Sequence, residues 1–306
     1  MPSPGRCCPT TSLGPSAKRR RERCKSPGAG RSDNLSAVSN AATRSRAIKI
    51  RKTILTQSKR ANVGHIGSCL SIADILATLY GGVLKFASPD ETDRDRLILS
   101  KGHAALALYG ALNAVGVIDD DLLETFCRDG SALGTHPEHV VPGIDFSTGS
   151  LGLGLSFGCG AALAARMQNS QRRIFVIVSD AECNEGALWE AVMFAAHRRL
   201  SNITAIVDAN GQQALGYTRD VLDLAPLGDK WRAFGWDVHS ADGHDPVELA
   251  NELNEPDQDG APRVVIARTT FGKGVSFMEN ELSWHYWPMS EDQYLAAIAE
   301  LEAQEI

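Results

Sequence analysis

The sequence predicts an α/β fold, a three-layer parallel sheet with helices on both faces. Short apolar runs typical of buried strands, Ile174–Val178 and Ile203–Val207 above all, alternate with longer amphipathic segments typical of helices. No internal repeat or interior linker interrupts this alternation, so residues 35–306 are expected to form one domain. The chain has 306 residues, of which 43% are hydrophobic, enough to bury a large core.

The N-terminal segment differs from the rest. Residues 1–31 carry eight Lys and Arg against Glu22 alone, leaving 23 basic and 36 acidic residues elsewhere. Rich in Pro, Gly and Ser and without an apolar period, residues 1–34 are expected to be a disordered basic tail. A nucleic-acid arm built on the KRRRERCK run is the alternative, to be tested by salt-dependent binding that deletion of the tail abolishes.

Composition also limits the cellular compartment and the kinds of partner that the sequence favours. No apolar signal segment follows the basic run, and no run reaches the ~20 apolar residues of a membrane span. Seven cysteines without a C-x-x-C pair fit neither a zinc site nor a disulfide framework. We expect a cytoplasmic protein with no membrane partner and, because the folded part is acidic, no nucleic-acid partner.

The individual elements follow from hydrophobic periodicity. Before the two central strands, the pattern predicts a long surface helix at 35–60, a second helix with an apolar face at 72–79, and a short strand that runs into a helix at 97–112, with His103 at the junction. It also predicts a helix at 119–128 and a helix packed with small residues at 149–165. After them it predicts helices at 229–234 and 246–253, strands at 236–239 and 263–267, and a final helix with Tyr294, Leu295, Ile298 and Leu301 on one face.

Polar residues follow both central strands at the point where each ends. Asp180 comes just after the first strand and Asn210 just after the second. In a parallel sheet these ends share one edge, where helix N-termini bind anions. A carboxylate and an amide oxygen are hard ligands suited to Mg²⁺ or Ca²⁺. The two turns therefore predict a cation site, with a phosphate beside it.

Five blocks of the chain, in order, resemble those of a known family. They are ANVGHIGSCLSIADILATLY, DRDRLILSKGHAALALYGAL, THPEH with STGSLGLGLS, SDAECNEGALWEA with VDANGQQALG, and GKGVSFMENELSWH. This series is similar to the thiamine-diphosphate-binding N-terminal domain of transketolases and covers roughly residues 35–302. The chain most resembles the separate N-terminal subunit of split bacterial transketolases.

The resemblance implies a cofactor site around the two turns. Asp180, Asn210 and the carbonyl of Gln212 would hold Mg²⁺, for which Ca²⁺ or Mn²⁺ could substitute, and the ion would clamp the diphosphate of thiamine diphosphate. Ala181 would lie beside that diphosphate. Gly149 and Leu151 would lie beside the aminopyrimidine and thiazolium rings.

The resemblance also assigns catalytic roles. His103 and His136 would contact the C1 hydroxyl of the ketose donor, and His103 would also touch the cofactor. His65 and His285 would contact the sugar and assist proton transfer, with His285 also near the diphosphate. Imidazoles suit these roles because near neutral pH they can both donate and accept protons and hydrogen bonds. Glu185 would lie against the cofactor site and meet its counterpart across a subunit boundary.

The implied activity is transfer of a two-carbon ketol unit from a ketose to an aldose. In the family a glutamate of the pyrimidine-binding domain activates the cofactor. We therefore expect a separately encoded C-terminal subunit, an α2β2 assembly, and no transferase activity from this chain alone. Another thiamine-diphosphate enzyme, of the 2-oxo-acid dehydrogenase or deoxyxylulose-phosphate synthase type, and a non-catalytic binding homologue remain alternatives.

Two departures from the family pattern affect the site. Ser179-Asp180-Ala181 stands where the family has Gly-Asp-Gly, and the methyl of Ala181 costs about 1 kcal/mol or more only if its φ is positive. Leu153 stands where many relatives have Gln or His. The sequence leaves the sugar open, because the groups that grip a sugar phosphate in this family lie largely outside this domain.

Overall fold

The structure is a computed structural model that describes residues 40–255 and 260–305. The predicted basic tail, residues 1–34, lies outside the described residues.

The centre of the fold is a five-stranded, all-parallel sheet in the order β1-β2-β3-β7-β6. The strands are β1 (Arg96–Leu99), β2 (Ile174–Ser179), β3 (Ile203–Ala209), β6 (Asp237–Asp242) and β7 (Arg263–Arg268). The two central strands predicted from sequence are β2 and β3, and they pair with each other up to Ser179 and Asp208. The chain therefore leaves them at one edge of the sheet. This arrangement confirms the predicted fold class.

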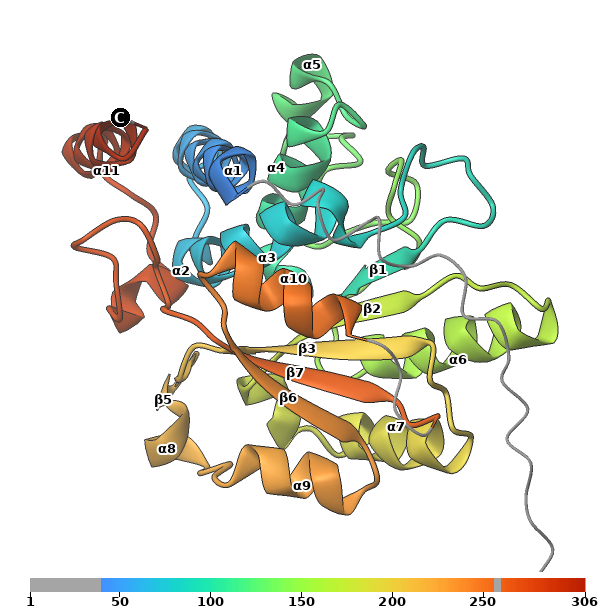
Figure 1. The fold of residues 1–306 in the computed structure, drawn as a ribbon. Coiled ribbons are helices and arrows are strands. Elements are labelled where there is room, and N and C mark those ends of the chain that lie inside the picture. The colour runs from blue at the N-terminus through green and yellow to red at the C-terminus, as the bar shows by residue number, and fades with distance from the viewer. Residues whose placement is uncertain (1–39, 256–259, 306) are drawn as a thin grey trace, which may run out of the picture. The chain divides into compact units, whose positions relative to one another are not determined.

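Helices cover both faces of the sheet (Figure 1). Those on one face are α1 (Asn40–Ala61), α2 (Ile66–Ser71), α3 (Ala73–Thr78), α4 (Ala105–Ala114), α10 (Pro246–Asn254) and α11 (Glu291–Ala303). Those on the other are α6 (Gly154–Met167), α7 (Gly186–His197) and α9 (Leu227–Ala233). Successive side chains of β2 point to opposite faces, with Phe175 and Ile177 in one core and Val176 and Val178 in the other. The outcome is two apolar cores separated by the sheet.

The smaller elements connect these layers. They are α5 (Asp120–Leu123), α8 (Thr218–Val221), the hairpin β4 (Gln212–Gln213) and β5 (Gly216–Tyr217), the 3-10 turns η2 (Gly102–Ala104), η3 (Ala181–Asn184) and η4 (Leu282–His285), and the π-helical turn η1 (Leu79–Val83). One helical run of the described residues, 66–83, is long and apolar enough to cross a membrane by length and composition, but 78% of it is buried inside the fold. The run consists of α2, α3 and η1, and its buried side chains belong to the same apolar core as those of α1 and α4.

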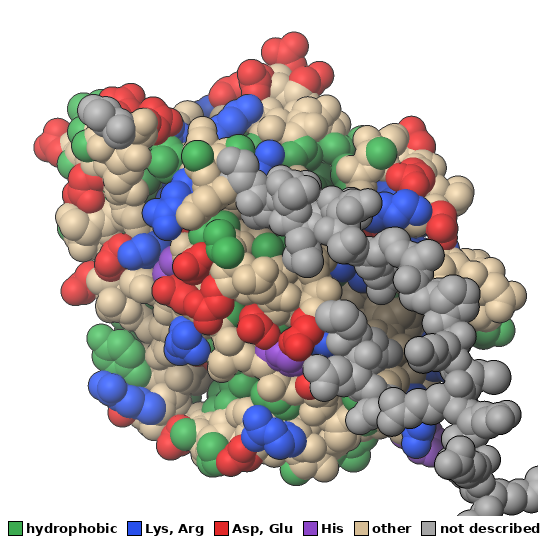
Figure 2. All heavy atoms as spheres, viewed as in Figure 1, with side chains coloured by type: hydrophobic (Ala, Val, Ile, Leu, Met, Phe, Trp, Pro, Cys, Tyr) green, Lys and Arg blue, Asp and Glu red, His purple; other side chains and the backbone are tan. Residues whose placement is uncertain are grey.

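Two predictions about helices are wrong in detail. The helix predicted over 119–128 ends at Leu123, because Cys127 adopts a left-handed backbone (φ 55°) and its N–H bonds to the Leu133 carbonyl at 2.7 Å. In α11, Leu295 does not share the buried face, since it is 56% exposed while Ala297 and Leu301 are buried. On the face shown in Figure 2, charged side chains of both signs are interspersed.

The strand order reverses between β3 and β7. The helix before β3, α7, lies on one face of the sheet, and the helix before β7, α10, lies on the other. A crevice forms outside the carboxyl ends of strands at such a switch point. The turns after β3 and β7 are therefore placed to bind a ligand.

Candidate functional site

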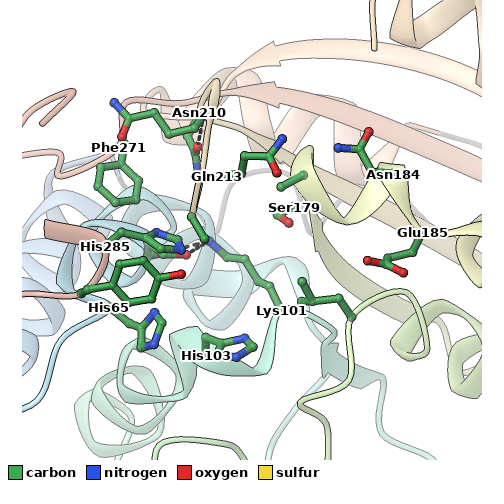
Figure 3. A pocket seen from close by; sticks show the side chains of 16 residues that line it. His65, Lys101, His103, Ser179, Asn184, Glu185, Asn210, Gln213, Phe271 and His285 are labelled. Atoms are coloured by element: carbon green, nitrogen blue, oxygen red, sulfur yellow. Dashed lines mark hydrogen bonds between the residues drawn. The ribbon is translucent and has the colours of Figure 1, made fainter. Parts of the chain in front are cut away.

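A pocket of about 360 Å³ opens at this edge of the sheet. Predicted site residues that line it are His65, His103, Leu151, Ala181, Glu185, Asn210, Gln212 and His285. In Figure 3, His65, His103 and His285 lie on one side of the pocket and Asn184 and Glu185 on the other, with Lys101 reaching between them. The structure thus gathers residues from five separate blocks of the sequence around one cavity.

Asp180 ties the two acidic turns together. One carboxylate oxygen accepts the N–H of Ala181 at 2.8 Å, and the other accepts the N–H of Gly211 at 2.7 Å. Asp180 is 5% exposed, and burial together with the nearby Asp208 carboxylate raises its pKa to about 7. A divalent cation beside Asp180 would supply the positive charge that favours its ionised form.

Two hydrogen bonds hold the side-chain amide of Asn210. Its Nδ2 donates to Asp208 at 2.8 Å, and its Oδ1 accepts the N–H of Gln212 at 2.9 Å. The Gln212 side chain is buried with neither its amide nitrogen nor its oxygen partnered among the described residues. Further buried polar atoms without a described partner surround the same pocket: Asn184 Oδ1, Gln213 Nε2, His65 Nδ1 and His285 Nδ1. Because buried polar groups normally have hydrogen-bond partners, these atoms are suited to contact a polar ligand that carries a cation.

Ala181 fits its position without strain. It opens η3, directly after Asp180, and is not among the described non-glycine residues with positive φ. A methyl group therefore costs little here. The hydroxyl of Ser179, which also replaces a family glycine, accepts the Glu182 N–H at 3.0 Å and so fastens the turn.

The four predicted histidines form a chain of ring contacts. Ring centroids are 5.4 Å apart for His65 and His285, 5.1 Å for His65 and His103, and 4.6 Å for His103 and His136. Burial, followed by neighbouring positive groups, lowers the pKa values of His65 and His285 to about 4 and lowers that of His103. These three imidazoles are therefore neutral near pH 7 and able to accept a proton or a hydrogen bond.

The glycine-rich turn before α6 packs closely against its neighbours. Gly149 lies against the His136 ring, whose Cδ2 would be 3.0 Å from an added Cβ. Gly152 has φ +82°, and an added Cβ there would lie 2.6 Å from the Cβ of Glu185. Glu185 is exposed and Leu153 is 38% exposed. The turn that carries Leu151 is thus wedged against the start of α7.

Sequence reasoning missed a buried ion pair at the pocket floor. Lys101 Nζ lies 2.6 Å from Asp208 Oδ2, with side chains 4% and 0% exposed. Although burial alone would raise the pKa of Asp208, Lys101 beside it holds that pKa below its usual value. Lys101 also donates to the Ser68 carbonyl at 2.8 Å. Its only signal was its place immediately before Gly102-His103.

The aromatic wall of the pocket was missed as well. Phe271 and Tyr286 line the pocket, and Tyr286 makes edge contacts with His65 and His285 at 5.8 and 5.0 Å between centroids. The His65 N–H donates to the His285 carbonyl at 3.0 Å. This bond fixes the aromatic loop to the start of α2.

These features define a class of protein. A parallel α/β sheet carries a carboxylate and an amide in the turns that follow two neighbouring strands, β2 and β3, and neutral imidazoles line the pocket at the same edge. This arrangement is suited to binding an anionic organic cofactor. Residues 43–302 match the family described as "Transketolase, thiamine diphosphate binding domain", and the chain belongs to this family.

Named relatives agree with that assignment. The chain is 43% identical over 259 residues to a 6-deoxy-6-sulfo-D-fructose transketolase subunit of Clostridium sp. (strain MSTE9), covering 83% of this chain and 94% of the relative. It is 39% identical to an apulose-4-phosphate transketolase subunit of Phocaeicola vulgatus, covering 83% and 91%. The solved transketolase of Leishmania mexicana superposes with a TM-score of 0.79 at 29% identity, and the match covers 87% of this chain but 42% of that one. The chain thus spans about two fifths of the solved transketolases.

Proposed function

We propose that this chain is the N-terminal subunit of a two-subunit transketolase, which binds thiamine diphosphate with Mg²⁺ and transfers a two-carbon ketol unit from a ketose to an aldose. The observation that carries the proposal is the joining of two strand-end turns by Asp180 at the edge of the sheet where the neutral imidazoles of His65 and His285 line the pocket. The near full-length match to relatives named as transketolase subunits supports it.

The residues present fit the cofactor. Asp180, Asn210 and the Gln212 carbonyl would hold the ion, which Ca²⁺ or Mn²⁺ could replace, and Ala181 would lie beside the diphosphate. When bound, thiamine diphosphate supplies the nucleophilic carbon that accepts the ketol unit. The chain's own part is to orient the cofactor, with Gly149 and Leu151 beside its rings, and to position the sugar.

The histidines would handle the sugar's hydroxyl protons. Because His65 and His285 remain neutral well below pH 7, each can accept a hydrogen bond or a proton from a sugar hydroxyl. His103 and His136 would bind the donor's first hydroxyl from the other end of the same row.

We also propose an α2β2 assembly with a separate C-terminal subunit that supplies the activating glutamate. Large apolar side chains are exposed on α6 and α7, with Phe157, Met193 and Phe194 at 36%, 48% and 40%. Glu185, at the start of α7, lies beside this surface and would meet its counterpart there. Such a surface on two adjacent helices is suited to burial against another chain.

A cytoplasmic location is part of the same proposal. The described cysteines, Cys69, Cys127, Cys159 and Cys183, are free, as is common in reducing compartments. Fractionation of cells expressing the tagged chain tests the location.

The experiment combines calorimetry with a transfer assay. The chain, mixed with its C-terminal partner, is titrated with thiamine diphosphate and Mg²⁺, and ketol transfer is measured with a phosphoketose, a sulfonated ketose and a branched sugar phosphate. We expect tight cofactor binding and ketol transfer by the pair, weak binding and no transfer by the chain alone, and loss of both binding and transfer in a pair that carries Asp180→Ala. Ordinary transfer by the chain alone would overturn the division of labour.

The alternatives predict other results. Turnover of 2-oxo acids by the pair would indicate a different thiamine-diphosphate enzyme. Absence of cofactor binding by the pair would indicate a non-catalytic homologue.

A further inference from the structure

Glu182 is a fully buried carboxylate with no assigned role. It is 0% exposed and lies in η3, two residues after Asp180. Its Oε1 accepts the N–H of Gly152 at 2.8 Å and the hydroxyl of Ser100, and its Oε2 accepts the N–H of Ser179 at 3.1 Å. Such burial is tolerated only when a charge is fully hydrogen-bonded.

The three donors come from three different turns of the site. Ser100 follows β1 and precedes Lys101 and His103, which line the pocket. Gly152 belongs to the turn that carries Leu151, and Ser179 ends β2. One side chain therefore connects the carboxyl ends of two strands with the glycine-rich turn before α6.

The chemistry of these contacts requires an acceptor. Backbone N–H groups can only donate, and the Ser100 hydroxyl, which accepts the Gly154 N–H at 3.1 Å, donates its own proton to Glu182. A neutral amide of the same shape would place an NH₂ group against a donor. A carboxylate is thus the side chain that satisfies all three turns.

The packing leaves little tolerance for displacement. An added Cβ at Gly154 would lie 2.3 Å from the Ser100 hydroxyl, and Gly152 is held between Glu182 on one side and the Cβ of Glu185 on the other. A shift of the Gly152 turn would therefore move Leu151 and Glu185 together.

We propose that Glu182 is a positioning residue that fixes three turns of the cofactor site relative to one another, so that its loss weakens cofactor binding without removing a group that contacts the cofactor. The cofactor part of this inference rests on the proposed function. Residues that orient metal ligands in this way commonly change metal affinity by about 10- to 100-fold when altered.

The test compares Glu182→Gln with Asp95→Asn in the chain assembled with its C-terminal partner. Asp95 is a matched control, since it is 3% exposed and accepts the N–H groups of Lys85 and Arg173 at the opposite end of β1. Thermal unfolding and the dissociation constant of thiamine diphosphate at saturating Mg²⁺ are measured for each. We expect both variants to lose thermal stability, but only Glu182→Gln to raise the dissociation constant, by about tenfold or more.

A milder variant keeps the proposal testable if Glu182→Gln does not fold. Ser100→Ala removes the hydroxyl that bridges Glu182 and Gly154 but leaves the carboxylate with its two amides, and it should raise the dissociation constant by a smaller factor. If Glu182→Gln does not fold, Ser100→Ala with an unchanged dissociation constant overturns the proposal. So does a Glu182→Gln protein that binds the cofactor as tightly as Asp95→Asn.

Amide hydrogen exchange on the cofactor-free chain separates this inference from the proposed function. Glu182→Gln should speed exchange at the amides of Gly152 and Ser179 relative to Asp95→Asn, whether or not the wild-type pair binds thiamine diphosphate. Wild-type failure to bind would refute the proposed function. Unchanged exchange at both amides would refute the positioning role.

Discussion

Breaking the buried pair of Lys101 and Asp208 should be among the most damaging single changes to this chain. The substitution Lys101→Met keeps the aliphatic stem but strands the Asp208 carboxylate, which is 0% exposed. Removing one partner of a buried pair typically costs about 3–5 kcal/mol. Asp208 keeps hydrogen bonds from Ser71, Asn210 and Thr269, so we expect the lower end of that range.

The assay is urea unfolding of the cofactor-free chain, with two comparisons. Lys52→Met removes an exposed pair with Glu305, whose side chains are 28% and 46% exposed, and should cost at most ~1 kcal/mol. Combining Lys101→Met with Asp208→Asn removes the stranded charge and should recover about 1 kcal/mol or more. A loss below ~1 kcal/mol in Lys101→Met, or a double variant less stable than both single variants, would refute this reasoning.

Two further predictions concern the pocket walls. His65 and His285 have pKa values of about 4 in the folded chain against 6.5 when unfolded, so the unfolded state binds more protons between these two pH values. The free energy of unfolding should therefore fall as the pH drops from 6.5 towards 4, which urea titrations at several pH values measure. A flat pH profile that His65→Asn and His285→Asn do not change would contradict this prediction. Gly67→Ala should lower the free energy of unfolding by several kcal/mol, because the added methyl would lie 2.1 Å from the buried Phe271 ring. Gly186→Ala is the control, since its methyl meets nothing within 4 Å and should leave the melting temperature nearly unchanged. Equal melting temperatures for the two variants would count against the packing described.

The sequence-based prediction succeeded where a residue's role depends on its place along a strand. Fully apolar runs specify buried strands, and parallel strands must end at one edge, so Asp180 and Asn210 could be placed near one another before any contact was known. The joining of their turns through the Gly211 N–H follows from that placement. The roles assigned to these residues, and to the histidines, remain proposals.

Other features depended on contacts between distant segments. The partner of Lys101 lies 107 residues away, and nothing in the local sequence at Asp208 distinguishes it from any polar residue near the end of a strand. The role of Glu182 has no local signal in the sequence, because its three donors come from separate turns. The early end of the helix predicted over 119–128 depends on the bond from Cys127 to Leu133, which hydrophobic periodicity does not report.

The separation of the interior into two cores affects how substitutions combine. Leu112 of α4 belongs to one core and Leu188 of α7 to the other, with the sheet between them. Changes at distant, unconnected positions usually add in free energy. Each helical layer can therefore change its packing during evolution without compensation from the other layer. Substitutions at the carboxyl edge of the sheet, where turns from both layers meet, must be compatible with both layers at once.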